Sequence, residues 1–232
     1  TLKEFYGLLQ QHNFPSFKVI GIILGLSVFI LMFLSYSFHI KIGYALLTLF
    51  YLTIPVSLIF DKSSQSPLVK FSITILGIAY IAIPLSLSIH IAFYPGSYNS
   101  GLIMAFFILL WANDTFAYLS GLAFGKTKLM ERISPKKTWE GLLGGGLVTV
   151  GLSLLLEKVF QIGFSPFDWM IIAFLIVIAG NFGDLTESVI KRALKVKDSG
   201  NVFPGHGGFL DRFDSILLAL PAVFAYVYIF KT

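Results

Sequence analysis

The sequence predicts an all-α, polytopic membrane protein: a helix bundle of about seven transmembrane helices with an interfacial helix on its N-terminal side. Hydrophobic residues make up 56% of the 232 residues and charged residues only 12%, whereas an ordinary soluble domain is about 25% charged. The apolar residues also gather in runs of roughly 20, the length that a helix needs to cross a bilayer. We therefore expect lipid to be the solvent for most of the chain, and a single integral membrane domain over residues 1–232.

Seven apolar runs are candidates for the membrane spans, and short polar segments separate them. The candidates are residues 19–36, 42–60, 69–93, 101–123, 141–157, 168–186 and 214–230. The fifth run is short and rich in glycine. The pairs Gly21 and Gly25, and Gly141 and Gly144, permit close helix packing, either within one chain or between two chains.

Residues 1–18 differ from the spans because their apolar residues alternate with polar ones. The apolar set is Leu2, Phe5, Tyr6, Leu9 and Phe14. These residues can share one helical face, which is typical of an interfacial helix lying on the membrane surface. A connector from an upstream span is the compatible alternative, and Thr1 and Glu4 have the spacing of a capping box.

The distribution of positive charge predicts the orientation. If the N-terminal side is cytoplasmic and the spans alternate, every Lys and Arg except Lys41, Lys158 and Lys231 falls on the cytoplasmic side. This positive-inside bias places loops 124–140 and 188–213 in the cytoplasm. The bias accounts for the net charge of +5, so we expect no nucleic-acid partner. The absence of cysteine excludes disulfides and thiolate metal sites within this chain.

Asp114 lies inside the fourth expected span, about ten residues from its cytoplasmic end and hence near the middle of the membrane. A carboxylate there costs roughly 2.5–3.5 kcal/mol on insertion scales, so it is a candidate functional residue. The alternative is a structural partner for Asn113, Thr115 or a lysine elsewhere.

The sixth span ends in a second polar cluster. Asp184, Glu187, Ser188 and Lys191 are spaced so that they share one helical face. Two carboxylates one turn apart suit a hard cation such as Mg²⁺, with waters and substrate phosphates completing its coordination. An ordinary solvated helix end is the alternative.

The segment 197–214 is rich in glycine and charge. Its glycines allow close backbone approach to a ligand, and successive N–H groups in such a loop can bind an anion. Asp211 and Asp214 lie one turn apart at the entrance of the last span, Arg212 can bind phosphate bidentately, and His206 is assigned a binding role. A plain turn explains the glycines but not the density of charge.

A fourth cluster precedes the glycine-rich fifth span. Lys136 and Lys137 are expected to bind phosphate as point charges, whereas Lys126 and Lys128 suit topology or anionic headgroups. Residues 121–127 have the wrong glycine spacing for a P-loop and follow a helix instead of a strand. Carboxylates and cations together suit polyphosphate chemistry with a divalent metal, and hence a nucleotide substrate. An ion transporter using Asp114 and Asp184, or a scaffold for anionic lipids, explains only part of the pattern.

The glycine-rich segment also carries a resemblance to a known family. The pattern is Ser188-x-x-Lys191-Arg192-x-x-x-x-Lys197-Asp198-x-Gly200-x-x-Phe203-Pro204-Gly205-His206-Gly207-Gly208-Phe209-x-Asp211-Arg212-Phe213-Asp214. It resembles the signature of the phosphatidate cytidylyltransferases, also called CDP-diacylglycerol synthases. The Asp114 segment and residues 134–141 resemble other blocks of that family, so residues 101–232 are the expected catalytic part.

The resemblance implies a nucleotidyltransferase in phospholipid biosynthesis that converts CTP and phosphatidate to CDP-diacylglycerol and pyrophosphate with Mg²⁺ or Mn²⁺. The implied partners are CTP, phosphatidate and bilayer lipid, in a cell inner membrane or an ER-type membrane. A second cation and a homodimer are compatible with the resemblance. A CTP-dependent lipid kinase, or a cytidylyltransferase for another lipid phosphate, is the nearest alternative.

The resemblance also implies roles for individual residues. Asp184 and Asp211 would hold metal, with Asp114 helping to place it. The expected catalytic residues are Asp114, Lys137, Asp184 and Asp211. The expected substrate-binding residues are Ser134, Lys136, Glu187, Ser188, Lys191, Arg192, Lys197, Asp198, Pro204, Gly205, His206, Gly207, Gly208, Arg212 and Asp214.

Overall fold

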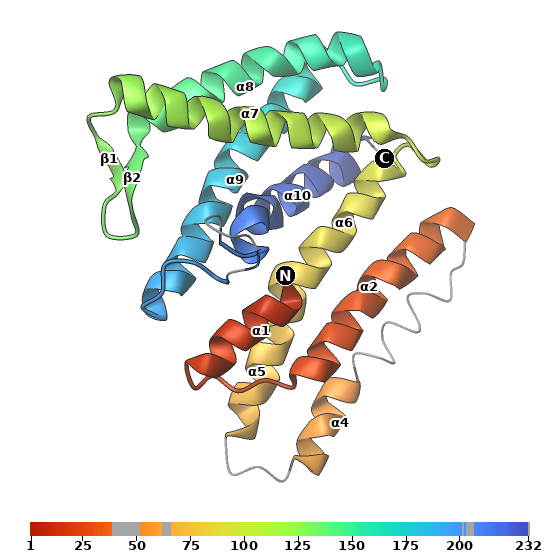
Figure 1. Ribbon diagram of the computed structural model, residues 1–232. Coiled ribbons are helices and arrows are strands. Elements are labelled where there is room, and N and C mark those ends of the chain that lie inside the picture. The colour runs from red at the N-terminus through yellow and green to blue at the C-terminus, as the bar shows by residue number, and fades with distance from the viewer. Residues whose placement is uncertain (39–51, 62–65, 201, 203–206, 232) are drawn as a thin grey trace. The chain divides into compact units, whose positions relative to one another are not determined.

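The computed structural model describes residues 1–38, 52–61, 66–200, 202 and 207–231 (Figure 1). In this part of the chain the protein is mostly helical. Its helices are α1 (Leu2–Gln11), α2 (Lys18–Phe38), α4 (Thr53–Phe60), α5 (Pro67–Gly77), η1 (Ile78–Ala82), α6 (Ile83–Ala92), α7 (Ser100–Phe124), α8 (Trp139–Phe160), α9 (Pro166–Ala193) and α10 (Leu210–Lys231). A two-stranded sheet joins β1 (Lys128–Met130) to β2 (Ser134–Thr138).

Six helices of the described residues are long and apolar enough to cross a membrane. They are Lys18–Phe38, Pro67–Ala92, Ser100–Phe124, Trp139–Phe160, Pro166–Ala193 and Leu210–Lys231. Each overlaps one of the expected spans, and the protein is therefore an integral membrane protein. The remaining expected span covers residues 42–60. Its first part, residues 42–51, lies outside the described residues, and its second part contains α4.

The chain groups into two compact units. The first contains Thr1–Ile89 and Leu194–Phe213, and the second contains His90–Ala193 and Asp214–Thr232. The core of the first unit includes a cluster of Leu24, Ile54, Ile78 and Ala82. The span Pro67–Ala92 changes from α-helix in α5 to π-helix in η1, and returns to α-helix in α6. The expectation of a single membrane domain remains a prediction.

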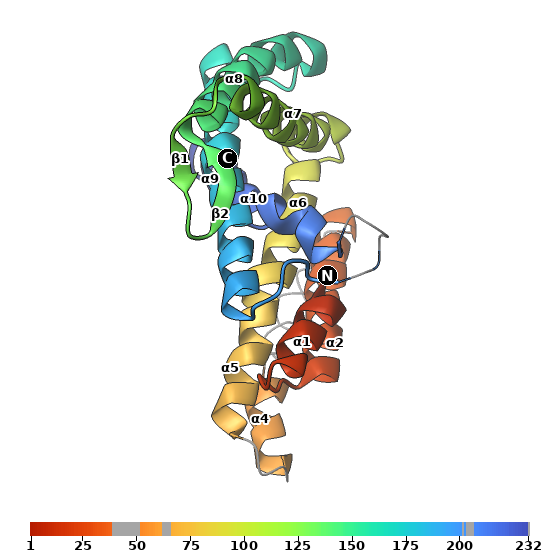
Figure 2. The ribbon, with the colours of Figure 1, turned by 60° about the vertical axis from the view of Figure 1, so that its left-hand side comes forward.

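Helix α1 forms where the interfacial helix is expected, and it packs against α2 and α5 (Figure 2). Tyr6 is fully buried, and its ring fills the space left by Gly21 and Gly77. Its hydroxyl donates a hydrogen bond to the Thr74 carbonyl at 2.8 Å. Burial raises the pKa of the Tyr6 phenol above its usual range, so the group remains a donor at neutral pH.

The expected capping box at the start of α1 does not form. Thr1 is the N-cap residue, but its side chain makes no capping hydrogen bond. Glu4 instead directs a carboxylate oxygen to the backbone N–H of Leu210, at 2.8 Å. A long-range contact therefore takes the side chain that local spacing had assigned to a local cap.

In the second unit, α7 and α8 run side by side because glycines remove side chains from their interface (Figure 1). A Cβ placed at Gly145 would lie 2.7 Å from the Ala117 backbone nitrogen, and one at Gly141 would lie 2.7 Å from the Ala117 carbonyl oxygen. Gly144 faces Ser120 in the same way. The glycine pairs noted in the sequence, including Gly21 and Gly25, are thus used within one chain.

The small sheet was not expected from the sequence, which predicted a loop. Strands β1 and β2 form an antiparallel hairpin between α7 and α8 (Figure 1). Both oxygens of Glu140 accept the Thr127 N–H at 3.1 Å, and one of them also accepts the Lys126 N–H at 3.1 Å. Thr138 caps α8 by accepting the Gly141 N–H at 3.1 Å. These bonds fix the path of the chain into α8.

Candidate active site

Three carboxylates from three helices gather in the second unit. Asp114 lies on α7, Asp184 on α9 and Asp214 on α10. Asp114 interacts electrostatically with Asp184, and Asp214 interacts with both of the others. We call these three residues the acidic group. Concentrated negative charge of this kind is unfavourable unless cations neutralise it.

Lys137 is the basic residue nearest to the acidic group. Strand β2 carries it, and its ammonium contacts an Asp184 oxygen at 2.7 Å. The lysine side chain is 23% exposed and the aspartate side chain 32% exposed, so both remain accessible to a ligand. Lys137 also interacts with the Asp114 carboxylate. The hairpin thus brings a predicted phosphate-binding lysine to two predicted catalytic aspartates.

Two asparagines that the sequence analysis did not assign to the site complete this group. The Asn181 carbonyl oxygen accepts from the Lys137 ammonium at 3.4 Å, and the Asn113 amide donates to Asp114 at 3.5 Å. Asn113 is only 1% exposed, and its own carbonyl oxygen has no partner among the described residues. The signal that could have revealed both residues is an amide within an apolar span, since such groups need partners in the membrane.

Close contact between α9 and α10 places Asp214 beside the α9 carboxylate. A Cβ at Gly183 would lie 2.5 Å from the Asp214 carbonyl oxygen and 3.0 Å from the Ser215 Cα. Only a residue without a side chain permits this approach. Gly183 directly precedes Asp184, so the approach of the helices also sets the position of the acidic group.

The remaining polar residues of the α9 face divide into two pairs. The Ser188 hydroxyl donates to Asp184 at 3.3 Å. Glu187 is fully buried and forms an ion pair with Lys191 at 2.5 Å. Glu187 is therefore engaged by the residue one turn later on its own helix. Arg192 at the end of the helix is exposed, and its Nε donates to the Ile133 carbonyl at 3.5 Å.

The glycine-rich segment forms a second polar cluster, in the first unit. One Asp211 oxygen accepts from the Ser199 N–H at 2.9 Å, the Ser199 hydroxyl at 2.8 Å and the Gly208 N–H at 2.7 Å. Gly207 has a positive φ of 77°, and a Cβ there would lie 2.5 Å from the same Asp211 oxygen. These bonds fix the Asp211 carboxylate at the start of α10, three residues before Asp214.

Glu4 also enters this cluster. Its carboxylate lies where Cβ atoms of Gly200 or Gly208 would stand. One oxygen accepts from Leu210, and the other is buried without a hydrogen-bond partner among the described residues. The two glycines thus make room for a glutamate that comes from α1, far away in the sequence.

The other predicted site residues are not among the contacts given above, or they lie outside the described residues. Pro204, Gly205 and His206 are outside the described residues. The exposed members of the predicted set include Lys136, Lys197, Asp198 and Arg212. Ser134 is half-buried at the start of β2. No role follows from these positions alone.

The acidic group can be compared with the needs of the expected metal. Among the residues that the structure describes, no three acidic or histidine side chains form a preassembled metal site. A Mg²⁺ ion that binds with a nucleotide does not require one, because it keeps several waters and uses one or two carboxylates plus phosphate oxygens. Asp184 and its acidic neighbours supply suitable oxygen ligands, so the residues fit this cation.

Comparison with known proteins agrees with these features. The model of the cytidylyltransferase family matches residues 1–230. The phosphatidate cytidylyltransferase of Rickettsia typhi is 35% identical over 233 residues, covering 97% of this chain and 96% of the relative. The phosphatidate cytidylyltransferase of Haemophilus influenzae is 44% identical over 134 residues (56% of this chain, 46% of the relative), and that of Bacillus subtilis 40% over 124 residues (53% and 46%).

The match extends over the expected spans as well as over the glycine-rich signature, so the resemblance seen in the sequence is confirmed. Both the acidic group with Lys137 and the Asp211 cluster lie within the matched residues. The chain belongs to the cytidylyltransferase family.

Proposed function

We propose that the protein is a phosphatidate cytidylyltransferase, which transfers the cytidylyl group of CTP to phosphatidate and releases pyrophosphate. The observation that carries this proposal is the meeting of Lys137 with the acidic group, in a chain that matches the family over residues 1–230. Cations and carboxylates on helices that cross a bilayer suit a substrate pair of which one member is a nucleotide and the other a lipid.

The reaction needs alignment and charge neutralisation more than a protein nucleophile. An oxygen of the phosphatidate phosphate forms a bond to the α-phosphorus of CTP. The bond from that phosphorus to the bridging oxygen breaks, and its electron pair leaves with pyrophosphate. A phosphate monoester has a second pKa of about 6, so the attacking group is largely ionised at neutral pH. Catalysis then depends on positioning and on electrostatic stabilisation.

The residues of the second unit have separate tasks in this scheme. Lys137 exchanges Asp184 for a substrate phosphate, and Asn181 keeps its ammonium in place during the exchange. Asp184, with Asp114 or Asp214, would hold Mg²⁺ or Mn²⁺, and the ion would neutralise phosphate charge. Lys191 is held by Glu187 in the same unit and adds positive charge near Asp214. Asp211 belongs to the first unit, where three hydrogen bonds fix it, and it is proposed as a further carboxylate that would bind metal.

The charge distribution supports one orientation in the membrane. Residues 124–140 and 188–213 carry most of the basic residues that the positive-inside rule assigns to the cytoplasm. CTP is a water-borne substrate, so these segments are proposed to lie on the side where CTP is supplied.

The test is a turnover assay with the purified protein in detergent, phosphatidate, labelled CTP and Mg²⁺. We expect pyrophosphate and CDP-diacylglycerol from the parent and a large loss with Asp184→Asn or Asp211→Asn. Asp61→Asn is the matched control, because Asp61 is also ion-paired with a lysine, Lys70 at 2.9 Å, but belongs to neither polar cluster. Release of CDP with a newly phosphorylated lipid alcohol would instead identify a lipid kinase. Ion flux without CTP turnover would support a transporter.

Metal dependence gives a second, independent readout. Chelation with EDTA should abolish turnover, and Mg²⁺ or Mn²⁺ should restore it, because the triphosphate and the acidic group cannot approach each other while both remain uncompensated. Full activity in EDTA would contradict the assignment of metal-binding roles to the aspartates.

A further inference from the structure

Two cavities lie in the first unit, beside α1. Their volumes are about 300 Å³ and about 630 Å³, which is within the range of about 300–1,000 Å³ typical of small-molecule pockets. Thr1 and Lys3 line both cavities. The two cavities are therefore neighbours at the start of α1.

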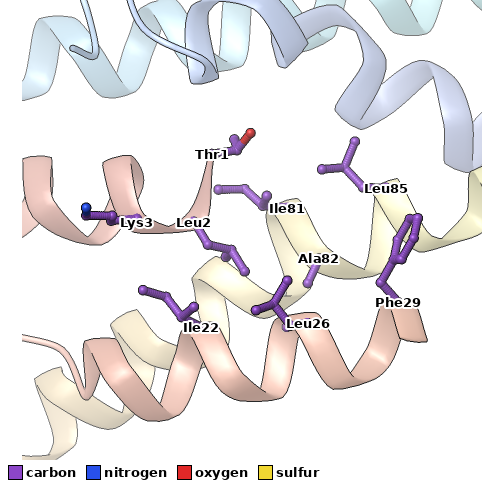
Figure 3. Close-up of a pocket in the computed structure, with 10 residues that line it drawn as sticks. Thr1, Leu2, Lys3, Ile22, Leu26, Phe29, Ile81, Ala82 and Leu85 are labelled. Atoms are coloured by element: carbon purple, nitrogen blue, oxygen red, sulfur yellow. The ribbon is translucent and has the colours of Figure 1, made fainter. Parts of the chain in front are cut away.

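The smaller cavity is apolar and is open to the outside of the helices. Figure 3 shows its lining, with Ile22, Leu26 and Phe29 coming from α2, and Ile81, Ala82 and Leu85 coming from η1 and α6. Leu26 and Phe29 remain 56% and 42% exposed. Both α2 and α6 belong to membrane spans, so this cavity is accessible to an acyl chain from the bilayer.

The larger cavity has charged side chains among its lining residues, and positive charge is in excess there. Lys3 and Lys18 line it, and the Lys18 ammonium lies 3.4 Å from the position that a Cβ of Gly7 would take. Neither lysine forms an ion pair within the described part of the chain. The acidic residue of the cavity, Glu4, directs one oxygen to the Leu210 N–H. Two ammonium groups are thus available to an anion.

The floor of the larger cavity comes from the glycine-rich segment. Ser199, Gly200 and Phe209 line it, and Ser199 is the residue whose N–H and hydroxyl bind Asp211. An anion held by the two lysines would therefore lie beside the segment that fixes a predicted catalytic carboxylate.

We propose that these cavities form a docking site for phosphatidate, with an acyl chain in the apolar cavity and the phosphate monoester between Lys3 and Lys18. This inference rests on the proposed function, because it names where the lipid substrate of that reaction is held by the first unit. Charge complementarity selects the occupant: a zwitterionic lipid could place a chain in the apolar cavity, but only an anionic headgroup gains from two lysines. An interfacial helix that packs over membrane spans provides both environments in one place.

Photo-crosslinking tests the site without requiring turnover. The full chain in lipid nanodiscs is irradiated with phosphatidate that carries a diazirine in one acyl chain, and the adducts are mapped by mass spectrometry. We expect adducts concentrated on residues 22–29 and 81–85 that unlabelled phosphatidate removes and phosphatidylcholine does not. Adducts spread evenly over the lipid-facing residues, or removed equally by both lipids, would overturn the proposal.

Kinetics provide the second test. At saturating CTP, Lys18→Ala should raise the KM for phosphatidate about fivefold, Lys18→Arg should keep it near the parent value, and the KM for CTP should not change. Leu26→Trp should also raise the phosphatidate KM by filling the cavity. Ile23→Trp is the matched control, because Ile23 has the same 56% exposure on α2 but does not line the cavity. Equal effects of the two tryptophans, or a changed CTP KM, would contradict the site.

Failure of this inference can be distinguished from failure of the proposed function. Turnover by the parent with unchanged phosphatidate KM in all these variants would reject the docking site alone. Specific crosslinking without any CTP turnover would support an anionic-lipid site and reject the proposed reaction.

Discussion

The ion pair between Lys137 and Asp184 gives the site a defined resting arrangement. A lysine facing the acidic group without a partner would leave uncompensated charge on both sides, and the 2.7 Å contact prevents this. Because both side chains remain partly exposed, substrate phosphate can replace the carboxylate without unfolding the hairpin. The proposed reaction therefore gives the pair a catalytic role in addition to its structural one.

Replacing Lys137 separates these two roles. Lys137→Ala should lower kcat roughly 100-fold or more, since a preorganised positive group that stabilises developing charge contributes on that scale. Lys137→Arg should retain more activity but less than the parent, because the guanidinium fork differs in reach and geometry from an ammonium. Steady-state kinetics with both substrates measures the effect. Lys158→Ala, a lysine in the last turn of α8, is the control, and an equal loss there would contradict the assignment.

Glu4 is the residue whose role changes most between sequence and structure. We expect Glu4→Ala to reduce turnover, because the Leu210 N–H loses its partner and the glycine-rich segment loses the group that fills it. Glu4→Gln should restore most of the activity, since its carbonyl oxygen can accept the same hydrogen bond. Turnover and thermal unfolding in detergent are measured together. Higher activity of Glu4→Ala would show instead that the carboxylate blocks the segment.

At the scale of the elements, glycine controls how closely neighbouring helices approach. Gly145 and Gly141 of α8 bring the α7 backbone near, and Gly183 of α9 brings α10 near. The helices α7, α9 and α10 each supply one carboxylate of the acidic group. Helix α8 packs against both α7 and α9, and α9 packs against α10, so both glycine contacts help to position these carboxylates. In lipid, such packing of small residues contributes much of helix association.

Two alanine substitutions on one helix test this dependence. Gly145→Ala should destabilise the protein by about 1–3 kcal/mol, because its Cβ would meet the Ala117 backbone at 2.7 Å. Gly151→Ala should be neutral or stabilising by up to about 1 kcal/mol, since no atom lies within 4 Å of the new Cβ and alanine favours the helix. Unfolding in detergent measures both. Equal destabilisation of both variants would contradict the assignment of the effect to packing at Gly145.

A capping box fixes the opposite end of α9. The Asp168 carboxylate accepts the Ser165 N–H at 2.8 Å, while the Ser165 hydroxyl accepts the Asp168 N–H at 3.2 Å. Tyr226 and Lys231 of α10 bind the same carboxylate at 2.6 Å each. The two helices that carry Asp184 and Asp214 are thus joined at their other ends by a polar network.

At the scale of the whole molecule, the orientation in the membrane can be tested directly because the chain has no cysteine. Glu131→Cys in the hairpin should react with a membrane-impermeant thiol reagent only from the cytoplasmic side. Ser97→Cys, in the turn between α6 and α7, should react only from the other side. Both residues are exposed, so accessibility does not bias the comparison. Labelling of both from one side would contradict the alternating topology.

Composition and hydropathy were sufficient to predict a membrane helix bundle, since a long apolar helix satisfies its own backbone hydrogen bonds in lipid whatever its neighbours are. The chemistry of Asp114, Asp184 and Asp214 was also predictable, because a carboxylate in or beside a span is costly and needs a reason. The signature around Asp211 added the family. These are properties of single residues and local segments.

The tertiary structure alone decided which of these residues meet. The contacts of Lys137 with Asp184 and of Glu4 with Leu210 join residues that are far apart in the chain. Glu140 also binds the backbone N–H of Thr127 at the base of the hairpin, a pairing that strand propensity does not encode. Helical spacing paired Thr1 with Glu4 and Asp184 with Glu187, but buried polar groups take the partner that satisfies them best in three dimensions. The sequence by itself therefore determined that lipid surrounds most of the chain and which polar side chains the chain carries. Tertiary packing determined which of these side chains contact one another.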